Sequence, residues 1–82
     1  MKIPIIRHLY QSQPAENLQA ALEVLESFTE SRGTTENDIN VAGELITNIC
    51  GALEVHEQVA NGSTERDALN AFAQRVVGAI DQ

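Results

Sequence analysis

The chain has 82 residues, of which 43% are hydrophobic and 21% are charged, a balance typical of a folded globular protein. Five Lys and Arg against twelve Asp and Glu give a formal net charge of −7, which excludes nucleic acid and anionic membrane surfaces as favourable partners. A single cysteine cannot form an internal disulfide, no apolar run approaches the roughly 20 residues of a membrane span, and no signal peptide is recognisable. We expect one cytoplasmic domain over residues 1–82.

Residues 1–10 fit two structures. The alternation from Ile3 to Leu9 is typical of a strand, whereas Pro4 suits the first turn of a short helix. No other segment of the sequence has a strand pattern, so a strand here would need a partner from another chain. The sequence therefore favours a short helix or an extended arm.

The first clear helix is predicted over residues 14–31. Pro14 suits the first helical position, and Glu16 lies where the helix dipole favours a carboxylate. Arg32 and Gly33 mark the end of this helix. Its apolar residues recur at the three- and four-residue spacing of one helix face: Leu18, Ala21, Leu22, Val24, Leu25 and Phe28.

A longer helix is predicted over residues 36–60. Thr35, followed three residues later by Asp38, matches a variant of the capping box, and no helix breaker occurs before Asn61 and Gly62. Projected at about 100° per residue, its apolar side chains cover more than half of the circumference. A helix this apolar should be central to the fold and contact more than one neighbour.

The last helix is predicted over residues 64–80, with Ser63 or Thr64 as its N-cap. Short loops join the three main helices, so successive helices should be antiparallel neighbours. We predict an all-α fold, a small antiparallel bundle of three main helices with a short N-terminal helix or arm. The apolar face of the last helix comprises Leu69, Phe72, Ala73, Val76 and Ile80.

The segment ITNICGALEVHEQVANG, residues 46–62, contains the only cysteine and one of the two histidines. Cys50 and His56 project about 120° apart on a helix, so they cannot act as a pair within one chain. Cys50 shares its face with Glu54 and Glu57, whose charge should raise the pKa of the thiol and disfavour the reactive thiolate. We expect Cys50 to behave as a small, semi-buried hydrophobic side chain.

His56 falls near the middle of the apolar arc, among neighbours on the same face that offer no hydrogen-bond partner. The partner should therefore come from another segment or another chain, because buried polar groups are nearly always paired. Two interpretations stay open. One is a near-core histidine paired with a side chain or a backbone carbonyl, and the other is a pH-sensitive contact at a helix or subunit interface.

Gly43, Thr47 and Gly51 lie four residues apart on the polar side of the long helix, although a glycine inside a helix costs up to about 1 kcal/mol relative to alanine. One interpretation is a close approach by the N-terminal segment or by a second protomer. The other is that glycine is simply tolerated at solvent positions. Alanine at both glycines should distinguish the two.

Three glutamates, Glu23, Glu26 and Glu30, form an acidic stripe along the first main helix. Such a stripe is usually a solvated face; the alternative is a docking strip for a basic protein partner.

The chain has no pattern typical of a metal site, a phosphate-binding loop or a catalytic triad, so we predict no metal, cofactor or catalytic residue. We expect a non-enzymatic interaction module that self-associates, most simply as a dimer, because a small domain gains stability from a second copy. An acidic carrier protein is an alternative. Acyl carrier proteins, however, bear their prosthetic group at an Asp-Ser-Leu signature, whereas Ser63 lies in NGSTERD.

The stretches LEVLESFTE, GELITNICGALEVHEQV and DALNAFAQRVVGAID resemble a family of short, uncharacterised bacterial proteins that is classified only as a domain of unknown function. The resemblance covers most of the chain and implies no catalytic or binding residue. It also implies genes located near those of thioredoxins or peroxiredoxins, which would suit a thiol-redox accessory role. The acidic neighbours of Cys50 argue against direct thiol chemistry.

Overall fold

The computed structural model describes residues 2–80, with side chains described as far as Arg75. The predicted all-α fold is confirmed, and the N-terminal segment is a helix rather than an arm. No strand occurs between residues 2 and 80. Val76 and Ile80, which the sequence places on the last apolar face, lie outside the residues whose side chains are described. The four helices are α1 (Ile3–Ser12), α2 (Ala15–Thr29), α3 (Glu36–Ala60) and α4 (Glu65–Ile80).

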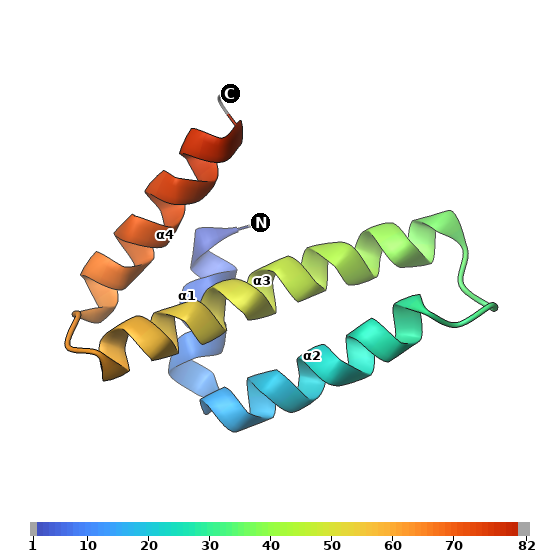
Figure 1. Cartoon of the computed structure of the whole chain (residues 1–82), viewed down its shortest axis with the longest axis horizontal. Helices are drawn as coiled ribbons and strands as arrows, with labels where there is room; N and C mark the ends of the chain where they lie inside the picture. Colours follow the sequence, from blue (N-terminus) through green and yellow to red (C-terminus); the bar gives the residue numbers. More distant parts are fainter. Residues whose placement is uncertain (1, 81–82) are drawn as a thin grey trace.

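The long helix α3 is central, because α1, α2 and α4 all pack against it. Figure 1 shows α2 running back along α3 in the opposite direction, while α1 crosses behind α3 and α4 turns back from the far end of α3 and diverges from it. In that view α1 and α4 lie beside the half of α3 that ends at Ala60, and α2 runs beside the half that begins at Glu36. The two halves of α3 are therefore covered to different extents.

Local hydrogen bonds define both ends of α3. The capping box predicted at its start is present: Asp38 N–H donates to Thr35 Oγ1 at 3.1 Å, and Thr35 N–H donates to Asp38 Oδ2 at 3.0 Å. At the other end Gly62 adopts a φ of 110°, and Ser63 N–H donates to the Gln58 carbonyl at 3.0 Å, as in a Schellman motif. Residues 36–60 thus form one unbroken helix, as predicted.

Other helix boundaries differ from the predictions by one or two residues. Pro14 is the N-cap of α2 rather than its first helical residue, and α2 ends at Thr29. Thr64, not Ser63, caps α4, since its Oγ1 accepts a hydrogen bond from Asp67 N–H at 3.1 Å. Differences of this size are common because helix ends fray.

The core lies where α1, α2 and α4 meet α3. Ile6 and Val55 are fully buried, whereas Ile5 is 40% exposed, so the packing of α1 does not follow the strand-like alternation of its sequence. Helical rotation brings Ile6 rather than its neighbour onto α3. The buried cluster comprises Ile6, Leu18, Ile49, Ala52, Val55, Ala68, Leu69 and Phe72.

Candidate interaction surface

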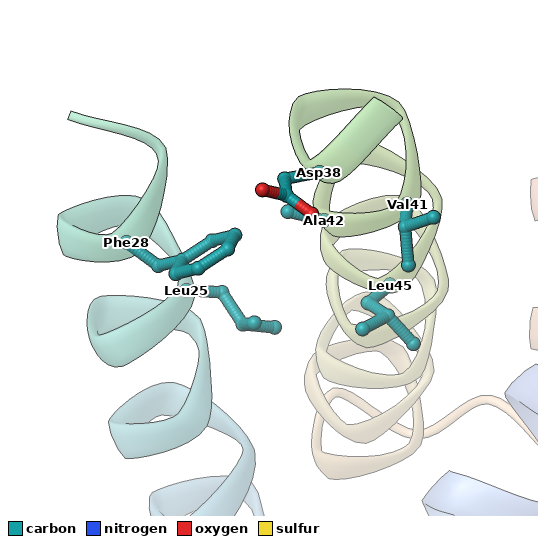
Figure 2. Close-up of a pocket in the computed structure, with 6 residues that line it drawn as sticks. All are labelled: Leu25, Phe28, Asp38, Val41, Ala42 and Leu45. Carbon is teal, nitrogen blue, oxygen red and sulfur yellow. The ribbon is translucent and has the colours of Figure 1, made fainter. Parts of the chain in front are cut away.

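An apolar groove of about 280 Å³ lies between the end of α2 and the beginning of α3. In Figure 2 the Phe28 and Leu25 side chains point from α2 toward α3, and the Asp38 carboxylate lies across from the Phe28 ring. Ala42 is buried and too small to fill the space between the two helices. The groove is lined by Leu25, Phe28, Asp38, Val41, Ala42 and Leu45.

Large apolar side chains surround this groove and face solvent. Half-exposed side chains of this size contribute roughly 300 to 400 Å² of apolar surface in total, which is within the range of the largest apolar patch on a typical monomeric protein, a patch that is often functional. We define the apolar face as Val24, Phe28, Val41 and Leu45, which are 68%, 43%, 53% and 47% exposed.

The acidic stripe lies on the other side of α2 from the apolar face. Glu23, Glu26 and Glu30 are all exposed, and at 100° per residue the centre of the stripe projects roughly 150° from that of Val24 and Phe28. Asp38, the one charged residue lining the groove, accepts a hydrogen bond at the start of α3. The groove is therefore lined by a single charged residue in a strongly acidic protein.

Cys50 lies on the acidic side of the α2–α3 pair and is exposed. The pKa of its thiol is raised, first by partial loss of hydration and second by the Glu26 carboxylate. The predicted direction is confirmed, but the charge comes from α2 rather than from Glu54 or Glu57. Glu54 instead pairs with Arg75 of α4. A thiol with a raised pKa stays protonated at neutral pH, which disfavours nucleophilic chemistry.

His56 is half-buried, and another segment supplies its hydrogen-bond partner, as the sequence predicted. Its Nε2 lies 2.9 Å from the carbonyl oxygen of Gln13, in the link between α1 and α2, and the Tyr10 ring centroid lies 4.5 Å from that of His56. Because a carbonyl only accepts, Nε2 carries a proton in both the neutral and the cationic ring. A half-buried histidine paired with a backbone carbonyl is the arrangement that the near-core interpretation describes.

Gly43, Thr47 and Gly51 have different environments. Gly43 and Thr47 are exposed, and Thr47 Oγ1 donates to the Gly43 carbonyl at 2.9 Å. Gly51 is buried, since a Cβ there would lie 2.7 Å from Ile6 Cδ1 and 3.1 Å from Phe72 Cε2. The N-terminal helix thus makes the close approach predicted for this position. The prediction of a polar side was wrong at Gly51, because α1 and α4 cover it.

A second recess, of about 370 Å³, separates α1 from α4. Gln11 Nε2 donates to Glu65 Oε1 at 2.7 Å and so connects the two helices. The recess carries both signs of charge, which gives it no preference for a ligand of one charge. Its lining residues are Arg7, Gln11, Glu65, Arg66, Leu69 and Asn70.

Within residues 2–80, no group of three His, Cys, Asp or Glu side chains is placed to hold a metal ion. None of the helices in the described part of the chain combines the length and hydropathy that crossing a bilayer requires.

These features define a small all-helical protein with an apolar groove on one side of a helix pair and an acidic stripe on the other. The chain belongs to DUF6952, a family of unknown function whose model matches residues 1–81. The family resemblance noted in the sequence is thereby confirmed. No match was found among curated proteins or among solved structures.

Proposed function

We propose that the protein is a non-enzymatic interaction module that self-associates through its apolar face. The observation that carries this proposal is the exposure of the four large side chains around a groove that no other described segment fills. Apolar surface removed from water stabilises a complex by about 25 cal/mol per Å², before the cost of association. A partner that covers this face therefore gains free energy.

A second copy is the occupant best supported by the charges. A basic partner would be drawn to the acidic stripe of Glu23, Glu26 and Glu30, which faces away from the groove. The groove itself has one charged lining residue, Asp38, so two acidic chains can meet there without opposing many like charges.

The two alternative functions have less support. A thiol-redox accessory role would use Cys50, whose raised thiol pKa counts against a reactive thiolate. An acidic carrier role would need a modified serine opening a helix, whereas the N–H of Ser63 closes the C-terminal motif of α3.

Sedimentation equilibrium over a wide range of protein concentrations tests the proposal. We expect a reversible monomer–dimer equilibrium for the native chain. Leu45→Glu should weaken it more than tenfold, because a charge placed in an apolar interface costs more than 1.4 kcal/mol.

Thr47→Glu is the matched control, because it adds the same charge at an exposed position about 160° around α3 from Leu45. It should leave the association constant nearly unchanged. A native protein that stays monomeric at every concentration would overturn the proposal.

A further inference from the structure

We infer that two copies pack apolar face to apolar face around a two-fold axis, with their α3 helices antiparallel and the axis passing between Val41 and Leu45. This inference rests on the proposed self-association and adds its geometry.

The part of the chain whose side chains are described, residues 2–75, presents one concentrated apolar face. Beyond it, the other large apolar side chains that are exposed in the described part are Ile5, on α1, and Ile39, which projects about 160° from Val41 around α3. Head-to-tail assembly requires two different complementary patches, whereas an isologous dimer uses the same patch twice. The one such face among the described side chains therefore suits a closed dimer, which uses the same patch twice, rather than a filament.

The shape of the face is self-complementary. Val41 and Leu45 lie one helical turn apart and form a ridge along α3, next to the groove that Phe28 and Leu25 line from α2 (Figure 2). Placing the ridge of each copy in the groove of the other buries both ridges. The product is a four-helix arrangement of two α2–α3 pairs, a packing that antiparallel helices readily form.

The position of the Asp38 carboxylate favours an antiparallel arrangement of the two α3 helices. Asp38 lies at one end of the groove, about 10 Å along the helix axis from Leu45. A parallel arrangement would place the two Asp38 carboxylates at the same end of the interface, whereas an antiparallel arrangement places them at opposite ends. Both acidic stripes then face outward, where water and salt screen them.

Cysteine cross-linking tests this geometry. In a Cys50→Ser background, chains carrying Val41→Cys and chains carrying Leu45→Cys are mixed, equilibrated and treated with a short bismaleimide. Intact mass spectrometry distinguishes the products because the two variants differ in mass. The yield of the dimer linked between positions 41 and 45 should exceed the combined yield of the 41–41 and 45–45 dimers several-fold. The reason is that position 41 of one copy faces position 45 of the other across the two-fold axis.

The chain with Cys50 alone is the control, since Cys50 projects about 180° from Val41 and should give little cross-linked dimer. Sedimentation of the same samples before cross-linking separates the two claims. A dimer dominated by 41–41 and 45–45 products, or one cross-linked through Cys50, would overturn the inferred geometry while leaving self-association intact. A monomer would instead overturn the proposed function.

Discussion

At Gly51 a single hydrogen atom in place of a methyl group lets α1 pack closely on α3. The nearest atoms belong to the side chains of Ile6 and Phe72, both buried in the core, so a methyl group at position 51 would have to displace packed side chains. Gly43, eight residues earlier, has nothing within 4 Å of the corresponding position. The two glycines occupy equivalent positions in the four-residue spacing of the sequence, but their surroundings in the structure differ.

Gly51→Ala should therefore destabilise the protein by about 1 kcal/mol, because overpacking costs about 1 to 3 kcal/mol and the gain in helix propensity returns up to about 1 kcal/mol. Gly43→Ala, the matched control, should stabilise it by up to about 1 kcal/mol. Urea unfolding of both variants measures the two effects. Equal stabilisation by both substitutions would show that α1 does not pack against Gly51.

Cys50 allows a second test at the residue scale. Because partial burial and Glu26 raise the pKa of the thiol, its alkylation by iodoacetamide near pH 8 should be slower than that of a cysteine in an unfolded peptide. Glu26→Gln should speed the reaction by a factor of roughly two, since it removes a charge that disfavours the thiolate.

Glu23→Gln removes the same charge from the same helix and serves as the control, with no change in rate expected. If both variants react alike, net charge rather than the proximity of Glu26 controls the thiol.

At the scale of elements, the main helices are predictable because their signals are local. Apolar spacing indicates α2, α3 and α4, and Thr35 with Asp38 marks the start of α3. The helix α1 was ambiguous because its ten residues fit two periods equally well. Contact with α3, through Ile6, selects the helical one.

The capping box predicts the effect of a substitution at the start of α3. Thr35→Ala should lower the free energy of unfolding by about 1 kcal/mol, because Asp38 N–H loses its side-chain acceptor. Thr35→Ser keeps the hydroxyl and should behave like the native chain. Thermal unfolding followed by circular dichroism compares the three proteins, and equal midpoints for all of them would mean that the capping box contributes nothing.

At the scale of the whole molecule, the half of α3 that begins at Glu36 carries the exposed side chains of Val41 and Leu45, which the proposed second copy would cover. If two copies cover each other, association stabilises the folded state by mass action. The midpoint of thermal unfolding should therefore rise with protein concentration for the native chain but not for Leu45→Glu. Differential scanning calorimetry at two concentrations measures this, and a native midpoint independent of concentration would count against a dimer.

The sequence by itself determined the three main helices and the separation of acidic from apolar positions around α2, because these properties repeat with the turn of a helix, and it located the capping box of α3 because that motif is local. It also indicated that His56 needs a partner from elsewhere. Only the tertiary structure decided that this partner is the Gln13 carbonyl, that Gly51 is covered and that Val41 and Leu45 are not. Whether a residue of α3 is buried depends on where α1 and α4 pack against that helix. Contacts between residues far apart in the chain determine this packing, and the local periodicity of the sequence does not encode such contacts.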